Sequence, residues 1–372
     1  MRLRDLDIAI GSGQPGPANA ITDVPGVRVG HADVIASTGT TSNLATGITA
    51  IIPYDRTPRR FFAGRYALDG GDGFTGLAVT EDFGALSTPI VLAPAAAVGK
   101  VYDGLIRYGL GLAAGLPEDA GWPPVVIGVD DRGVNDPVVV HASVAQDHLD
   151  SALATARGGE VEEGAVGVGA GLVSFGVRGG VGTASRSLQV DGRQCHAGVL
   201  VATNGGEPAR LSVDGVPVGG QLSVTAAAPG VPRTAVAVVA TDAPCDPRQL
   251  DRLAGRAALG LTRVGLLDAL TREGLVIAVS TSGLDDAGGE TGITSSIQMT
   301  SEQVLPALFA AAAEACEEAV LNALLAARTR ADVPLSDVHQ GPDRPGLVNA
   351  HRTLPTATWP QLVRDHRQRR GN

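Results

Sequence analysis

Short apolar runs bounded by glycine or proline recur along the whole chain, and this pattern limits what the chain can fold into. Runs of this length and composition are typical of buried β-strands. They lie at 26–36, 46–53, 88–94, 123–130, 137–144, 196–204, 221–228, 234–241 and 275–281. Segments with helical periodicity lie between them, at 97–115, 145–157, 246–262 and 301–328. The pattern predicts an α/β fold with at least one large sheet.

The start of the last long helix and the chain after it are less sharply defined. Thr300 and Gln303 have the spacing of a capping box, whereas Pro306 favours a start near 305 or a kink. After this helix the apolar pattern stops, and residues 338–372 are rich in proline and arginine. We therefore expect one domain over 1–337 and a surface-laid or disordered tail over 338–372.

Charge and cysteine content narrow the class of partner. The net charge of −10 argues against nucleic acid or an acidic membrane surface, which require a clustered positive surface. The three cysteines are odd in number and have no C-x-x-C spacing, so we expect a reducing compartment. No histidine has metal-ligand spacing, so we expect no metal site. The opening residues lack the apolar region of a signal peptide. We expect a cytoplasmic protein that binds a small molecule or another copy of itself.

Several motifs that would assign a chemistry are missing. The glycine-rich segment 164–182 contains no G-x-G-x-x-G and is too long for one strand-to-helix turn, so we interpret its glycines as sites of close backbone contact. The residues around Lys100 do not form a Walker loop, and no G-x-S-x-G is present. One unusual feature remains, namely that the apolar run 234–241 begins with Thr234, directly after Arg233.

Seven segments together resemble the DmpA family of L-aminopeptidase/D-esterases and β-peptidyl aminopeptidases, which also includes nylon-oligomer and pantetheine hydrolases. They are NAITDVPGVRVGH (19–31), FFAGRYALDGGDGFTG (61–76), GVGAGLVSFGVRGGVGTASR (167–186), VLVATN (199–204), SVDGVPVG (212–219), VVATDAP (238–244) and EEAVLNALLAA (317–327). They occur in the family's order over roughly 19–335. The resemblance implies an αββα sandwich, two packed sheets covered by helices, and a homo-oligomer without a cofactor.

The resemblance also implies self-cleavage between Arg233 and Thr234, giving fragments 1–233 and 234–372. Thr234 would then be the nucleophile, and its own α-amine, with a pKa of about 8, would accept the hydroxyl proton. The alternative is an ordinary strand threonine. Asn204 matches the family's oxyanion-hole asparagine, or is only a turn residue before two glycines. Arg178 matches a basic position that orients the nucleophile or a carboxylate, or is a surface arginine.

The chain departs from the family at three places. Family members have a polar triplet that holds the new amine, and the corresponding segment here is TREGL. An ungapped alignment places Arg272 and Gly274 at the two polar positions of the triplet, whereas a one-residue shift places Thr271 and Glu273 there. We favour Glu273, against a solvated turn carboxylate. Alanines replace the polar turn residue in APAAAVG (93–99), which predicts a less polar pocket wall.

The third departure concerns the acid that binds a substrate's free amine. It aligns with Gly128, so that only Asp130 or Asp131 could replace it. We therefore expect a self-processing N-terminal-threonine hydrolase of small amides or short peptides, an aminopeptidase or an amidase. The alternative is an uncleaved binding or assembly module, which Arg233 at the cleavage position and the altered triplet favour.

Overall fold

The computed structural model describes residues 1–37, 43–54, 59–69, 73–112, 124–190, 192–222, 234–269, 271–282, 284–285, 296–327, 354 and 356–370. Its strands are β1 (Arg28–Ser37), β2 (Asn43–Ile52), β3 (Phe61–Leu68), β4 (Ala85–Leu86), β5 (Ile90–Pro94), β6 (Val125–Val129), β7 (Val173–Ser174), β8 (Val177–Arg178), β9 (Gly180–Val190), β10 (Arg193–Asn204), β11 (Ser212–Val213), β12 (Val216–Pro217), β13 (Thr234–Thr241), β14 (Glu273–Ser280), β15 (Leu284–Asp285) and β16 (Ser296–Ile297). Its α-helices are α1 (Leu77–Phe83), α2 (Val98–Leu110), α3 (Pro137–Ser143), α4 (Gln146–Ala154), α5 (Pro247–Val264), α6 (Leu305–Ala326) and α7 (Trp359–Arg370).

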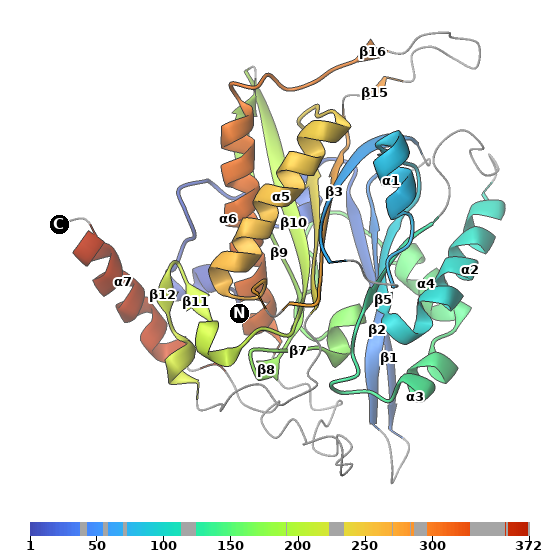
Figure 1. The fold of residues 1–372 in the computed structure, drawn as a ribbon, viewed down its shortest axis with the longest axis horizontal. Helices are drawn as coiled ribbons and strands as arrows, with labels where there is room; N and C mark the ends of the chain where they lie inside the picture. The colour runs from blue at the N-terminus through green and yellow to red at the C-terminus, as the bar shows by residue number, and fades with distance from the viewer. Residues whose placement is uncertain are drawn as a thin grey trace.

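Two main sheets pack face to face between two layers of helices (Figure 1). The larger sheet has the order β4-β3-β14-β13-β10-β9 and is covered by α5 and α6, while the smaller has the order β1-β2-β5-β6 and lies beside α2 and α4. One apolar cluster fills the space between the sheets and a second lies under α5 and α6. The expected arrangement of two packed sheets covered by helices is confirmed.

The centre of the larger sheet brings together segments that are far apart in the sequence. β13 pairs antiparallel with β10 on one side and parallel with β14 on the other, and β14 pairs antiparallel with β3. The eight residues of β13 are all buried, as its continuous apolar run predicts. Residues 223–233, including Arg233, lie outside the described residues.

The prediction of a strand over 137–144 was wrong, because this segment forms α3. Asp136 caps the helix by accepting a hydrogen bond from the Val138 amide at 2.8 Å, and Pro137 occupies the first helical position. These helix-start signals outweigh the β propensity of the three valines that follow. The strands β3 and β9 were not predicted from the sequence, and most of the strand expected over 221–228 lies outside the described residues.

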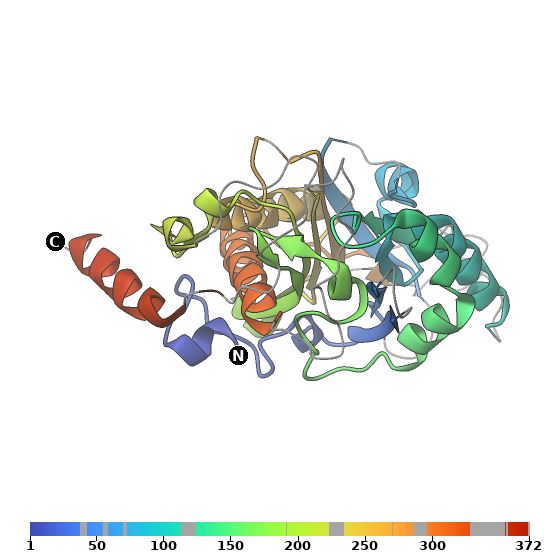
Figure 2. The ribbon, with the colours of Figure 1, turned by 90° about the horizontal axis from the view of Figure 1, so that it is seen from below.

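The last long helix begins at Leu305, which places Pro306 in its first turn. The start near 305 is thus confirmed and the capping box is wrong, since the Thr300 hydroxyl donates to the Pro244 carbonyl at 2.6 Å instead. Part of the expected tail is the helix α7, which lies at one side of the molecule (Figure 2). Its Trp359 is fully buried and Arg367 forms an ion pair with Asp214 at 2.7 Å, so this part is laid on the surface.

The glycine-rich segment has the packing role that was expected of it. A Cβ at Gly182 in β9 would lie 2.1 Å from the Ala319 carbonyl oxygen of α6, and one at Gly179 would lie 2.2 Å from the Thr203 carbonyl oxygen. Only glycine allows these backbones to approach so closely. The segment therefore sets the distance between β9 and α6 and brings Arg178 close to the end of β10.

Candidate active site

Three of the predicted site residues form a row across adjacent strands of the larger sheet. Thr234 is the first residue of β13, where it pairs with Asn204, the last residue of β10. On the other side it pairs with Glu273, the first residue of β14. Residues paired in this way are direct neighbours across a sheet. We call Asn204, Thr234 and Glu273 the Thr234 row.

The side chains of the Thr234 row point to the same face of the sheet. Side chains alternate between faces along a strand, so Thr234 lies on the face of Val236 and Val238, which belong to the cluster between the sheets. By the same alternation Asn204 lies with Leu200 and Ala202, and Glu273 with Leu275 and Ile277. Thr234 and Asn204 are each 2% exposed and Glu273 is half-buried. The row therefore faces the smaller sheet.

The register distinguishes between the two alignments of the TREGL segment. Arg272 and Gly274 lie on the opposite face from Thr234, and a Cβ at Gly274 would approach Leu267 on that face at 2.9 Å. The Thr271 hydroxyl is engaged in a turn, where it accepts a hydrogen bond from the Asp268 amide at 2.9 Å. Of these four positions, Glu273 is the one beside Thr234, and it begins a strand rather than lying in a solvated turn.

Asn204 connects the two sheets. Its side-chain Nδ2 donates to the backbone oxygen of Asp130 at 2.6 Å, and Asp130 directly follows β6 of the smaller sheet. The carboxyl ends of the parallel strands β5 and β6 thus lie beside the Thr234 row, the position at which α/β sheets commonly bind ligands.

The β7–β8 hairpin carries Arg178 to the same edge. Phe175 and Gly176 form its two-residue turn, both with positive φ. The hairpin is fixed to the residue after Asn204, because the Phe175 amide donates to the Gly205 carbonyl at 2.7 Å and the Gly205 amide donates to the Val173 carbonyl at 2.8 Å. Arg178 is 3% exposed, so the interpretation as a surface arginine was wrong.

Asp130 and Asp131 are both buried, and each is engaged by another residue. The Asp130 carboxylate accepts hydrogen bonds from Nε of Arg132, at 2.9 Å to each oxygen. The Asp131 carboxylate accepts from Nδ2 of Asn135 at 2.9 Å, and Asn135 in turn bonds the amide and the carbonyl of Ala45 in β2. Burial raises the pKa of Asp131 to about 6. Arg132 and Asn135 were not predicted as partners of the aspartates, although both follow them within five residues.

Gly128, near which the family resemblance places an acid for the substrate amine, has no room for a side chain. A Cβ at Gly128 would lie 2.9 Å from Cγ2 of Val98 and 3.3 Å from Cα of Ala95. Gly128 also pairs with Gly73, whose carbonyl accepts its amide at 2.8 Å. This wall of the site is built from backbone and small apolar side chains, as the alanines of 93–99 predict.

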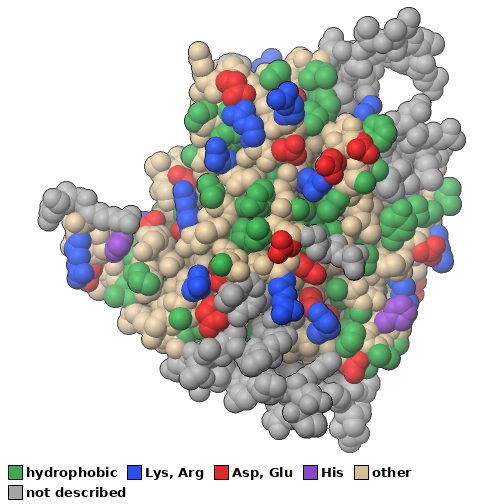
Figure 3. Space-filling view, in the orientation of Figure 1, with side chains coloured by type: hydrophobic (Ala, Val, Ile, Leu, Met, Phe, Trp, Pro, Cys, Tyr) green, Lys and Arg blue, Asp and Glu red, His purple; other side chains and the backbone are tan. Residues whose placement is uncertain are grey.

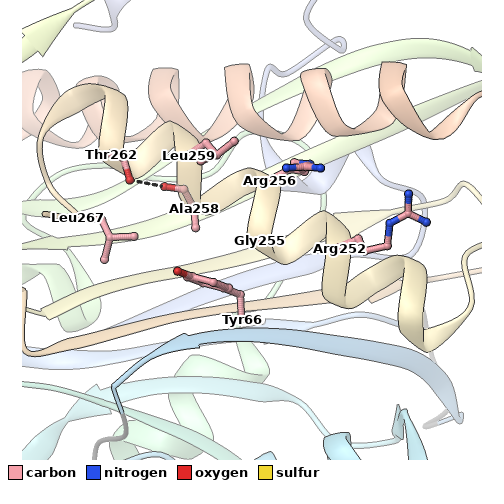
Figure 4. A pocket seen from close by; sticks show the side chains of 8 residues that line it. All are labelled: Tyr66, Arg252, Gly255, Arg256, Ala258, Leu259, Thr262 and Leu267. Atoms are coloured by element: carbon pink, nitrogen blue, oxygen red, sulfur yellow. Dashed lines mark hydrogen bonds between the residues drawn. The ribbon is translucent and has the colours of Figure 1, made fainter. Parts of the chain in front are cut away.

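A depression lies on the face of the larger sheet opposite to the Thr234 row (Figure 4). It has a volume of about 400 Å³ and is lined by residues of α5, β3 and the turn after α5: Tyr66, Arg252, Gly255, Arg256, Ala258, Leu259, Thr262 and Leu267.

Figure 3 shows acidic and basic side chains interspersed over one face of the molecule. Within the described ranges no cluster of His, Cys, Asp or Glu could hold a metal ion, and no helix is long and apolar enough to cross a membrane.

Comparison with known proteins agrees with this geometry. The profile of peptidase family S58 matches residues 19–334. The chain belongs to peptidase family S58. Among S58-like relatives, beta-peptidyl aminopeptidase BapA of Sphingosinicella xenopeptidilytica is 35% identical over 88% of this chain and 85% of its own length. The corresponding protein of Sphingosinicella microcystinivorans is 36% identical over 88% and 86%.

Solved structures place this S58 member among the N-terminal-nucleophile hydrolases. The L-aminopeptidase D-Ala-esterase/amidase of Ochrobactrum anthropi, a variant of that fold, superposes with a TM-score of 0.82 at 30% identity and covers 100% of this chain and 99% of its own. A Burkholderia sp. beta-aminopeptidase superposes with a TM-score of 0.81 at 35% identity, covering 99% of both chains. The predicted resemblance to the DmpA family is confirmed, and the chain is a peptide or amide hydrolase of this type.

Proposed function

We propose that this chain is a self-processing N-terminal-threonine hydrolase that cleaves amide bonds in short peptides or similar small amides. The Thr234 row carries the proposal. In it a buried hydroxyl lies between an amide donor and a carboxylate, on the face of the sheet that borders the carboxyl ends of β5 and β6. This combination provides a nucleophile, a donor for an oxyanion and a partner for an ammonium group.

Self-processing would begin with attack of Thr234 Oγ on the carbonyl carbon of Arg233. The peptide C–N bond breaks as the C–O bond forms, which converts the peptide into an ester and frees the α-amine of Thr234. Water then hydrolyses the ester, restoring the hydroxyl and leaving a carboxylate on Arg233. The place of Thr234 at the start of a fully buried strand supports this role, because the strand holds the new terminus rigidly.

Turnover would use the same hydroxyl. The free α-amine accepts its proton while Oγ attacks the substrate carbonyl, and a side-chain N–H of Asn204 stabilises the oxyanion. The proton then passes to the leaving amine, and water hydrolyses the threonyl ester. Glu273 accepts hydrogen bonds from the ammonium form of the α-amine, and Arg178 supplies positive charge at the Asn204 edge. No metal or organic cofactor is required for these steps.

The same geometry bears on the class of amide. Asp130 is paired with Arg132 and Asp131 with Asn135, so neither carboxylate is held ready for a substrate ammonium. The names of relatives include both aminopeptidases and an esterase/amidase. We propose an amide hydrolase that accepts short peptides without requiring their free amine.

Intact-mass spectrometry under denaturing conditions tests the proposal directly. Scaling the 37.6 kDa mass by the lengths of 1–233 and 234–372 gives fragments of roughly 24 and 14 kDa. Thr234→Ala should remain a single folded chain without activity, and Thr234→Ser should retain part of both reactions. A folded wild-type sample that stays intact on ageing would favour the uncleaved binding module, and an active alanine variant would exclude Thr234 as the nucleophile.

A further inference from the structure

Arg132 is an exposed cation beside the Thr234 row that has no part in the chemistry above. It lies in the turn after β6, two residues beyond Asp130, and the backbone oxygen of Asp130 binds the Asn204 side chain at 2.6 Å. The Arg132 side chain is 65% exposed, whereas that of Asp130 is only 12% exposed. An inward-facing carboxylate therefore anchors an outward-reaching guanidinium at the edge of the site.

The hydrogen bonds of Arg132 determine which edge of its guanidinium is occupied. Nε donates to both Asp130 carboxylate oxygens at 2.9 Å, and Nη2 donates to Oδ2. These bonds use the side edge of the planar group. The remaining donors, on Nη1 and on the far side of Nη2, form the end edge, which has the spacing needed to bind a second carboxylate with two hydrogen bonds.

The carboxylates of Asp130, Asp131 and Glu273 lie near Arg132, so a further carboxylate would bind through direct hydrogen bonds at the open end edge and not through an excess of local positive charge. Hydrogen bonding to Asp130 is the main cause that raises the pKa of Arg132, and the charge of Glu273 is a further cause, so Arg132 lies within electrostatic range of the Thr234 row. The neighbouring wall at Gly128 and Ala95 is uncharged. The part of a bound substrate that extends from Thr234 out of the Thr234 row would approach the Arg132 guanidinium.

We propose that Arg132 is a specificity-determining residue that binds the free carboxylate of short peptide substrates. The inference rests on the proposed amide hydrolysis at Thr234 and adds the class of substrate. Asp130 would orient the guanidinium from the side edge, while the substrate carboxylate would bind the end edge. Arginine is suited to this because its planar fork matches a carboxylate.

Paired substrates that differ only in this carboxylate test the proposal. Ala-Ala and β-Ala-Ala should each be cleaved by the wild type with a higher kcat/KM than their C-terminal amides. Arg132→Ala should lower kcat/KM about 10- to 100-fold for the acid forms and leave the amide forms within about twofold, which is the range expected for a charged hydrogen bond. Arg132→Lys should retain part of the preference, because the charge remains without the fork.

Two further variants separate recognition from structural support. Arg107→Ala is the matched control, because the Arg107 side chain on α2 is also 65% exposed and paired with an aspartate, Asp103. This variant should leave the ratio of kcat/KM for the acid forms to kcat/KM for the amide forms unchanged. Asp130→Asn weakens the anchor on the side edge of the guanidinium and should lower the preference for acid forms about threefold or more, with the amide forms less affected. An equal fall for acid and amide forms in Arg132→Ala would overturn the proposal, since Arg132 would then act only through Asp130 and Asn204.

The readouts also keep this inference separate from the proposed function. A self-cleaved, active enzyme whose ratio of acid to amide does not respond to Arg132→Ala contradicts the inference alone. Turnover of p-nitroanilides without turnover of any acid form contradicts it as well. An active Thr234→Ala variant contradicts the assignment of Thr234 as the nucleophile. If the ratio of kcat/KM for acid forms to amide forms still depends on Arg132 in that case, the carboxylate site is supported independently.

Discussion

One of the two N–H groups of the Asn204 side chain is occupied by the Asp130 carbonyl at 2.6 Å, which leaves the other for a reacting group. This bond orients the amide beside Thr234 across the strand pair. A preorganised donor is worth more in a buried site than in water, because it needs no reorganisation during the reaction. The proposed role of Asn204 as an oxyanion donor thus depends on a residue that follows a strand of the other sheet.

Asn204→Ala should lower kcat about 10²- to 10³-fold with little change in KM, the usual effect of removing one oxyanion donor. Steady-state kinetics on the self-cleaved protein measure this. Asn135→Ala is a useful comparison, because Asn135 supports the Asp131 turn without lying in the Thr234 row. If Asn204→Ala keeps the wild-type kcat, the side chain only connects the two sheets.

The two aspartates after β6 lead to a prediction about the substrate's amine. Because Arg132 and Asn135 already engage them, a substrate ammonium would be desolvated without a charged partner, which is unfavourable by several kcal/mol. Amino-acid p-nitroanilides and their N-acetyl forms should therefore have comparable kcat/KM values. A strong preference for free amines that Asp130→Asn or Asp131→Asn abolishes would show that one of these carboxylates binds the amine.

Two glycines of α5 show how packing of secondary-structure elements depends on single positions. A Cβ at Gly260 would lie 2.4 Å from the Ala313 carbonyl oxygen of α6, whereas one at Gly255 would meet only Tyr66, at an ordinary 3.7 Å. The two helices therefore approach closely at Gly260 and not at Gly255. Both glycines are on the same helix, so helix propensity affects them alike.

Gly260→Ala should lower the free energy of unfolding by about 1–3 kcal/mol, because α5 and α6 must move apart. Gly255→Ala should raise it by about 0.5–1 kcal/mol through the better helix propensity of alanine. Urea denaturation of both variants measures the difference. Equal effects at the two positions would mean that the contact between α5 and α6 adjusts without loss of stability.

For the whole molecule, a buried polar cluster joins the two predicted fragments. Glu318 of α6 is fully buried and binds Arg186 at 2.8 Å, Arg4 at 2.8 Å and Asn19 at 2.6 Å, all of which lie in 1–233. Burial opposes ionisation, but Arg186 and the hydrogen bonds from Arg4 and Asn19 hold the pKa of Glu318 below its usual value. The central strands β13 and β14 are also flanked by β10 and β3 of that fragment.

Glu318→Ala should lower the free energy of unfolding by about 3–5 kcal/mol, because Arg186 would be left buried without this partner. The measurement uses urea denaturation of the uncut Thr234→Ala chain, so that dissociation of fragments does not contribute. Glu302→Ala is the control, because Glu302 pairs with Arg252 on the surface and should have little effect. Similar results for the two glutamates would argue against a role for the cluster in holding the fragments together.

Local sequence was sufficient wherever the determining interactions are themselves local. The apolar run 234–241 predicted β13 with its exact bounds, and the helical pattern at 246–262 predicted α5, which Asp246 caps and which begins at Pro247. The same kind of signal at Asp136 was overlooked in favour of β propensity, which led to the wrong strand at 137–144. The glycine-rich segment was correctly interpreted as a packing element, since close approach is the usual reason for such glycines.

The neighbours of Thr234 were decided by tertiary structure. The sequence identified Thr234 and Asn204 through resemblance to a family, but it left Glu273 and Arg272 as alternatives, because the register between strands 30 or more residues apart depends on long-range pairing. Likewise, no local pattern could show that the Asp130 carbonyl orients Asn204 or that Arg132 lies at the site. These contacts form only when the two sheets pack, since the sheets bring together chain segments that share no local interactions.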